Sequence, residues 1–106
     1  MAADQSRVMT TLHIEHPVTD FSTWNRAFDG FAELRAKAGV RSHVVRRPID
    51  DNHYVVIDLD FDAEQDAAEF LEILRTRIWS TPSNSPALAG SPISRLFNTE
   101  EAHAPR

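Results

Sequence analysis

The segment Tyr54-Val55-Val56-Ile57-Asp58-Leu59-Asp60-Phe61 decides how this chain folds. Every second residue of it is apolar, and the set is Val55, Ile57, Leu59 and Phe61. A period of two in a segment rich in β-branched and aromatic residues predicts a strand with one strongly apolar face. We place this strand at the centre of a small sheet and arrange the other predicted elements around it.

A strand and a helix are predicted before this segment. Residues 8–15 predict the first strand, which the His16-Pro17 pair ends because proline cannot donate to a ladder. Asp20 is a suitable N-cap for a helix with an apolar stripe of Phe, Trp and Leu. Gly39 suits the left-handed turn that stops this helix. Arg35, in its last turn, suits the negative end of the helix dipole.

Residues 41–49 predict the second strand, and the Asp50-Asp51-Asn52 turn joins it to the central segment as a hairpin. Asp62 with Gln65 resembles a capping box for a second helix that ends near Trp79. Residues 85–90 predict one extra helical turn, and residues 93–98 predict the last strand.

The order of elements is β-α-β-β-α-β, the split βαβ or ferredoxin-like motif. Right-handed crossovers place both helices on one face of the antiparallel sheet. The predicted class is therefore α+β. The domain is expected to span residues 8–98, between a polar leader (1–7) and a polar tail (99–106).

The other face of this sheet is too apolar to leave in water. It would carry Tyr54, Val56 and either Val44 or Val45. It would also carry Leu96, or else Ile93 and Phe97. A second copy of the sheet is the simplest cover, so we predict a homodimer in which two sheets face each other.

Composition excludes several classes of function. The 106 residues carry a net charge of −5 and no cysteine. An acidic chain disfavours nucleic acid and anionic membrane surfaces as partners. The lack of cysteine fits a reducing cytoplasm, and the first residues have no apolar core of a signal peptide. We expect a cytoplasmic protein.

The helix start Val18-Thr19-Asp20-Phe21-Ser22-Thr23-Trp24-Asn25-Arg26-Ala27-Phe28-Asp29 resembles the pattern V-x-D-[YF]-x-x-W-x-x-x-F-D of dimeric α+β barrel proteins related to antibiotic biosynthesis monooxygenases. The Ala38-Gly39-Val40 and Ala89-Gly90-Ser91-Pro92-Ile93 stretches continue this resemblance. It implies a ligand cavity between sheet and helices, or in the dimer interior. Known quinone-forming members use no metal or flavin, and place Asn, Trp, Tyr and Arg around an aromatic substrate. No cofactor is therefore expected.

His13 and Asp58 are the candidate catalytic residues. Both lie on the second sheet face, where parallel neighbouring strands would bring them together. A His–carboxylate pair can act as general base toward a phenolic or α-carbonyl proton. The alternative is a buried polar pair that sets the register of the dimer.

Two aromatic residues and three arginines are candidates for ligand binding. Tyr54 and Trp79 are aromatic types that could form pocket walls. One or more of Arg46, Arg47 and Arg95 could point inward and bind an acidic group. Their alternative role is ion pairing at the rim.

No metal site is predicted. The acidic residues from Asp58 to Glu69 follow the spacing of a calcium loop, but Ala63 stands where glycine is needed. His13 and His16 are three apart on a strand, so they face opposite sides.

Two functions remain open. The first is a cofactor-independent oxygenase acting on an aromatic or polyketide-like small molecule. The second is a non-catalytic ligand-binding or structural dimer domain. A lined pocket within reach of His13 and Asp58 would favour the first function.

Overall fold

The computed structural model describes residues 9–103 and confirms the predicted order of elements. The strands are β1 (Thr10–Pro17), β2 (Val40–Arg46), β3 (Tyr54–Phe61) and β4 (Ile93–Asn98). The helices are α2 (Phe21–Gly30), α3 (Ala32–Ala38) and α4 (Glu64–Ile73), and α4 continues into a π-helical turn, η1 (Leu74–Ile78). The predicted leader and Val8, which was expected to begin the first strand, lie outside the described residues.

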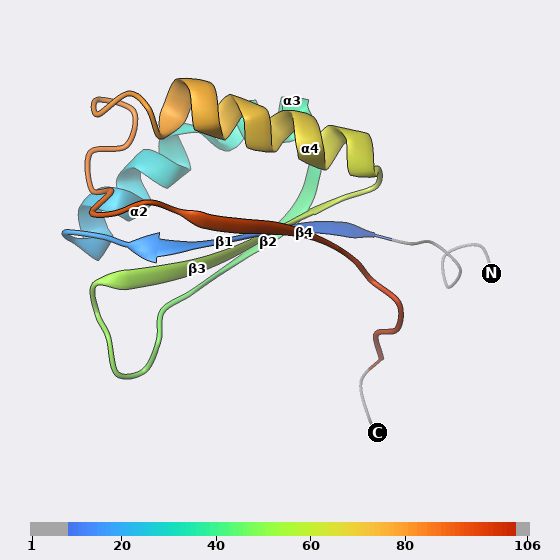
Figure 1. The fold of residues 1–106 in the computed structure, drawn as a ribbon, viewed down its shortest axis with the longest axis horizontal. Coiled ribbons are helices and arrows are strands. Elements are labelled where there is room, and N and C mark those ends of the chain that lie inside the picture. The colour runs from blue at the N-terminus through green and yellow to red at the C-terminus, as the bar shows by residue number, and fades with distance from the viewer. Residues whose placement is uncertain (1–8, 104–106) are drawn as a thin grey trace.

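The strands form one sheet in the order β2-β3-β1-β4, and every pair is antiparallel. All three helices cover one face of it, and the other face is left open (Figure 1). The α+β ferredoxin-like fold is thus confirmed. The expected parallel pairing of the first and third strands is wrong: the right-handed crossover makes β2 parallel to β1, and the hairpin then reverses β3.

The core lies between the sheet and the helices. The apolar face predicted for the central segment is buried, and it packs with β1 and α4 around it. The buried apolar set is Leu12, Ile14, Val18, Val55, Ile57, Leu59, Phe61, Ala67, Phe70, Leu71 and Ala87. The period of two in β3 therefore selects the face that carries the helices.

The first helix starts as predicted and is interrupted in its middle. The Asp20 carboxylate accepts the Thr23 backbone N–H at 2.8 Å, which confirms the N-cap. The predicted single helix is broken at Phe31 into α2 and α3. Gly39 ends α3 in the left-handed region with φ 101°, as expected.

Further local predictions are wrong. β1 continues through His16 to Pro17, the pair that was expected to end the first strand. The second helix has Ala63 as its N-cap, and Gln65 bonds to Glu69 instead of completing a capping box. The second strand ends at Arg46, three residues short of the expected end. Residues 85–90 form turns instead of a helical turn, because Leu88 makes a β-bridge with Val18.

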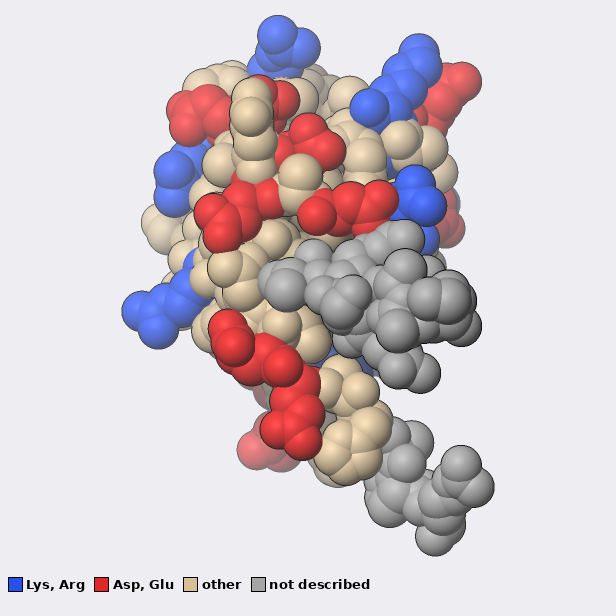
Figure 2. Space-filling model, turned by 90° about the vertical axis from the view of Figure 1, so that its right-hand side faces the viewer, with Lys and Arg blue, Asp and Glu red and all other residues tan. Residues whose placement is uncertain are grey.

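The surface agrees with the mixed composition. On the side of the molecule that Figure 2 shows, acidic side chains lie across the middle and basic side chains mostly toward the edges. Among residues 9–103, no helix is long and apolar enough to cross a membrane.

Gly30, the last residue of α2, and Gly39, which ends α3, give a stability prediction. Gly39→Ala should destabilise the protein by about 1–2 kcal/mol, because alanine is strained in the left-handed region. Its Cβ would also lie 3.3 Å from Asp66 Oδ2. Gly30→Ala is the matched control: nothing lies within 4 Å, so it should be neutral or stabilise by up to about 1 kcal/mol. Urea unfolding of both variants measures the difference, and equal stabilities would contradict this account of the turn.

Candidate functional site

Polar and aromatic side chains that could bind or react lie on both faces of the sheet. The pairing register of the strands shows which face each side chain is on. Val44 lies opposite Asp58 in β2–β3, so Val44 faces the open side and Val45 the helices. Arg95 lies opposite His13 in β1–β4, and Ile93 and Phe97 share its face. Leu96 therefore faces the helix side. The open face thus carries Val44 and not Val45, and it carries Ile93 and Phe97 and not Leu96.

A continuous polar cluster crosses the open face. His13 Nδ1 lies 2.7 Å from Asp58 Oδ1, and His13 Nε2 lies 2.9 Å from Glu15 Oε2. The Tyr54 hydroxyl donates to Glu15 at 2.8 Å, and Arg46 donates to Asp58 at 3.3 Å. Both ring nitrogens of His13 are thus engaged by carboxylates.

The hydrogen bonds within the cluster shift the pKa values of His13, Glu15 and Tyr54. The hydrogen bond to Glu15, followed by the contacts with Asp58, raises the pKa of His13, although partial burial opposes this shift. The bonds from His13 and Tyr54 lower the pKa of Glu15. The Glu15 carboxylate in turn raises the pKa of Tyr54. The carboxylates of Glu15 and Asp58 thus both stabilise the imidazolium form of His13.

The structure brings together most of the site residues predicted from the sequence. His13, Asp58, Tyr54 and Arg46 are in one hydrogen-bonded cluster, and Arg95 shares their face. Trp79 is separate from them, because it follows η1 on the opposite side of the sheet. Arg47 lies beyond the end of β2, with its guanidinium 4.3 Å from the centre of the Phe21 ring.

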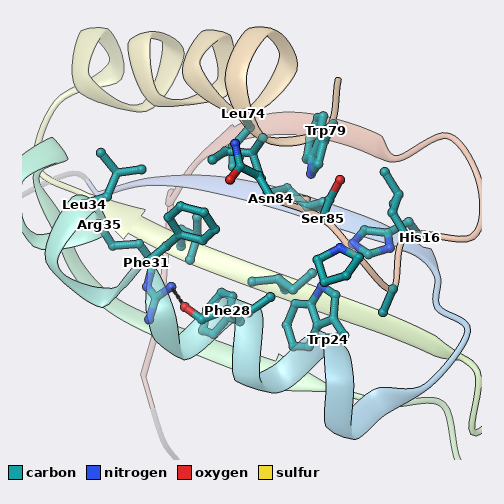
Figure 3. Close-up of a pocket in the computed structure, with 18 of the residues that line it drawn as sticks. His16, Trp24, Phe28, Phe31, Leu34, Arg35, Leu74, Trp79, Asn84 and Ser85 are labelled. Atoms are coloured by element: carbon teal, nitrogen blue, oxygen red, sulfur yellow. Dashed lines mark hydrogen bonds between the residues drawn. The ribbon is translucent and has the colours of Figure 1, made fainter. Parts of the chain in front are cut away.

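A cavity of about 80 Å³ lies on the other side, between the sheet and the helices. Figure 3 shows Trp24 and Phe28 of α2 on one wall, and Leu74 and Trp79 on the wall across from it. His16, at the end of β1, lies near Trp24 at one end of the cavity. The lining is mostly apolar and aromatic, with a few polar groups, which is the usual make-up of a small-molecule site.

Aromatic stacking and a buried arginine shape the α2 wall. The Trp24 and Phe28 rings are stacked with centres 4.9 Å apart. The Arg35 guanidinium sits 3.7 Å from the centre of the Phe28 ring and donates to the Phe28 carbonyl (Figure 3). Arg35 lies in the last turn of α3, as expected from the sequence, and it is only 7% exposed, so it is also a cavity residue.

The opposite wall depends on irregular backbone. In η1 the Trp79 N–H donates to the Leu74 carbonyl at 2.7 Å, five residues back, which places both side chains on the cavity wall. The loop after Trp79 then folds back onto β1: Thr19 N–H donates to the Ala87 carbonyl at 2.9 Å. This loop supplies Asn84 and Ser85 to the cavity. Such π-helical turns are frequent at functional sites.

The sequence reasoning missed His16, Arg35 and Asn84 as site residues. The alternation of β1 was a usable signal for His16, because His16 shares the face of Leu12 and Ile14. No comparable signal existed for Arg35 or Asn84, whose positions depend on the helix break and on the loop. In the part of the chain that the structure describes, no group of three or more His, Asp or Glu is placed to hold a metal ion.

The polar cluster predicts a specific titration. Glu15→Gln should lower the pKa of His13, because the largest stabiliser of the imidazolium is removed. The pKa of His13 is raised on folding, so its contribution to stability is complete below about pH 6.5 and lost as pH rises through the raised value. NMR titration of the histidine rings measures this. His16, on the other face, is the internal control, and an unshifted His13 would contradict the cluster.

No protein-family model matches the sequence, and no curated protein does. Solved structures do resemble it. One is a monooxygenase from the gene ActVA-Orf6 of Streptomyces coelicolor in complex with nanaomycin D, at 20% identity and TM-score 0.62, with 100% of both chains covered.

Two further structures share the arrangement. A mutant of SnoaB, a cofactor-independent oxygenase from Streptomyces nogalater, has 13% identity and TM-score 0.62, covering 92% of this chain and 97% of that one. A dimeric ferredoxin-like protein from an uncultured marine organism has 10% identity and TM-score 0.64, with 100% of both chains covered. Identities this low establish the fold and leave the function open. The chain thus has the ferredoxin-like fold found in antibiotic biosynthesis monooxygenase-like and dimeric ferredoxin-like proteins.

Proposed function

We propose that this chain is a cofactor-independent oxygenase that binds a small phenolic aromatic in the helix-side cavity. The observation that carries the proposal is the cavity itself, in which Trp24 and Trp79 lie on facing walls and His16 lies at one end. Flat aromatic walls favour a flat aromatic ligand through stacking and apolar burial. The cytoplasmic location expected from the cysteine-free sequence remains a prediction.

The size of the cavity limits the ligand. At about 80 Å³ it is far below the roughly 300–1,000 Å³ that encloses a drug-sized molecule. We therefore assign one aromatic ring to the cavity, either as the whole ligand or as the end ring of a fused polycycle.

The reaction balances with dioxygen as the only co-reactant. A phenol with a free ring position loses two hydrogens and gains one oxygen atom, which gives a quinone, and the second oxygen atom leaves as water. The chain's own contribution is to bind the ring, exclude water from it and remove the hydroxyl proton.

Two comparisons support this proposal. SnoaB is described as a cofactor-independent oxygenase, and the Streptomyces coelicolor monooxygenase was solved with the ligand nanaomycin D. The competing function is a binding domain without catalysis. It is favoured by the mutual pairing of His13, Glu15 and Asp58, which leaves the originally expected general base occupied.

We further propose that the open sheet faces of two copies pair, with the polar cluster at the centre of the interface. Apolar side chains are left partly in solvent there: Val44 is 42% exposed, Phe97 48% and Ile93 61%. Buried together with Val56, they would add apolar contact area around the paired charges. In this arrangement His13 and Asp58 set the register of the dimer.

Variants of Leu74 test the cavity. Leu74→Trp should fill it and weaken binding of 1-naphthol by about tenfold or more, whereas the matched Leu74→Ala keeps it open and should bind. Equilibrium dialysis under nitrogen measures binding. In air, oxygen uptake and 1,4-naphthoquinone formation in a 1:1 ratio measure turnover.

Binding without turnover would favour the non-catalytic function. Equal binding by both Leu74 variants would show that the ligand lies elsewhere, and the open face would then be the site to test.

Variants of two apolar residues test the dimer. Val56→Asp places a charge in the middle of the open face and should give a monomer in native mass spectrometry, because an unpaired buried carboxylate is costly. Ile49→Asp is the matched control: Ile49 is fully exposed and lies beyond the end of β2, so this variant should stay dimeric. A Val56→Asp protein that remains a dimer would contradict the facing of the two sheets.

A further inference from the structure

We propose that His16 is the catalytic base of this site, and that its Nε2 accepts the proton of the substrate's phenolic hydroxyl. This inference rests on the proposed function, since it needs an aromatic ligand in the helix-side cavity. It assigns the chemical step to a histidine on the face of β1 opposite to the polar cluster.

The first argument is the tautomer. His16 Nδ1 lies 2.9 Å from the carbonyl oxygen of Pro17. A carbonyl oxygen can only accept, so Nδ1 must carry the hydrogen and donate it. In the neutral ring the lone pair is then on Nε2, which makes this atom the acceptor.

The second argument is that the ring is held in place. The Pro17 carbonyl also accepts the Ala89 backbone N–H at 3.2 Å, and the Val18–Leu88 bridge lies beside it. The loop that closes the cavity thus fixes the group that orients His16. A base positioned by a second bond in this way is the usual arrangement of a proton-accepting histidine.

The third argument is access to the cavity. His16 is only 3% exposed, and its one hydrogen bond is made by Nδ1. Among the described residues, every side-chain nitrogen or oxygen that has no accessible surface makes a hydrogen bond. Nε2 of His16 makes none, so this atom is not completely enclosed. Nε2 therefore keeps some accessible surface, and His16 is one of the residues that line the cavity.

Electrostatics keep the ring ready to accept a proton. Burial lowers the pKa of His16, with the Pro17 bond opposing, so the ring is neutral at pH 7. Arg35, on α3 at the far end, supplies the charged side chain of the described cavity wall, and no Asp or Glu lines it. No carboxylate there favours the imidazolium before substrate binds.

His13 offers the contrasting case. Both of its ring nitrogens contact carboxylates, at 2.7 and 2.9 Å, and these contacts raise its pKa. It has no lone pair free for a substrate. Of these two β1 histidines, His16 is thus the one whose surroundings suit a base, and His13 the one whose surroundings suit an ion pair.

In the step itself the phenolic O–H bond breaks and its electron pair stays on oxygen. The proton forms a new N–H bond at Nε2, which leaves a phenolate beside an imidazolium. The phenolate ring is electron-rich and is the form that gives up electrons to dioxygen.

Paired ligands test this assignment. Wild type should bind 1-naphthol about tenfold more tightly than 1-methoxynaphthalene, because only the phenol can donate to Nε2. His16→Asn keeps an amide that can donate to the Pro17 carbonyl but removes Nε2. It should bind both compounds equally and form naphthoquinone about 10²–10⁴-fold more slowly. His53→Asn, the same change at an exposed turn, should match wild type.

A second readout needs no variant. On acidification through the lowered pKa of His16, Nε2 becomes a donor, so the preference of wild type for the phenol should disappear. If the His16→Asn variant still preferred 1-naphthol and formed naphthoquinone at the wild-type rate, His16 would not be the base. The proposed oxygenase function of the cavity would still hold in that case. If wild type bound neither compound, the proposed function would itself fail.

Discussion

The antiparallel pairing of β1 with β3 is the constraint on which the rest of the structure depends. Leu12 lies opposite Leu59, and Ile14 opposite Ile57, so these pairs bury one face beneath the helices. Because side chains alternate, the same register places His13 opposite Asp58 on the other face. A slip of one residue would exchange the two sets and expose the core. Apolar packing thus fixes where the polar groups meet.

The two faces give similar side chains different chemical states. On the open face, carboxylates from β1 and β3 saturate His13 and favour its charged form. On the covered face, burial without a carboxylate favours neutral His16. The general rule is that desolvation and nearby charge act in opposite directions on an imidazole. Saturated ion pairs suit a structural role in an interface, whereas a neutral ring with one free nitrogen suits proton transfer.

The cavity depends on contacts between segments that are distant in the chain. The break at Phe31 lets α3 turn Arg35 inward, so that its guanidinium reaches Phe28. The π-helical turn brings Trp79 over the cavity, and the loop after it docks on Pro17 and Val18. These irregular features bring together the polar groups of an otherwise apolar lining. Binding sites are commonly built in this way, by loops and irregular backbone on a regular scaffold.

The amino-acid sequence alone was sufficient to predict the order of the elements, the buried face of β3, the Asp20 cap and the turn at Gly39. These follow from alternation, capping and backbone conformation, which act over a few residues. It also placed His13 and Asp58 on one face. The tertiary structure alone decided that β1 and β3 run antiparallel, that Trp79 lies apart from Tyr54, and that Arg35 is buried. It alone left His16 with a free nitrogen at a cavity, because cavities and pKa values arise from contacts between distant segments.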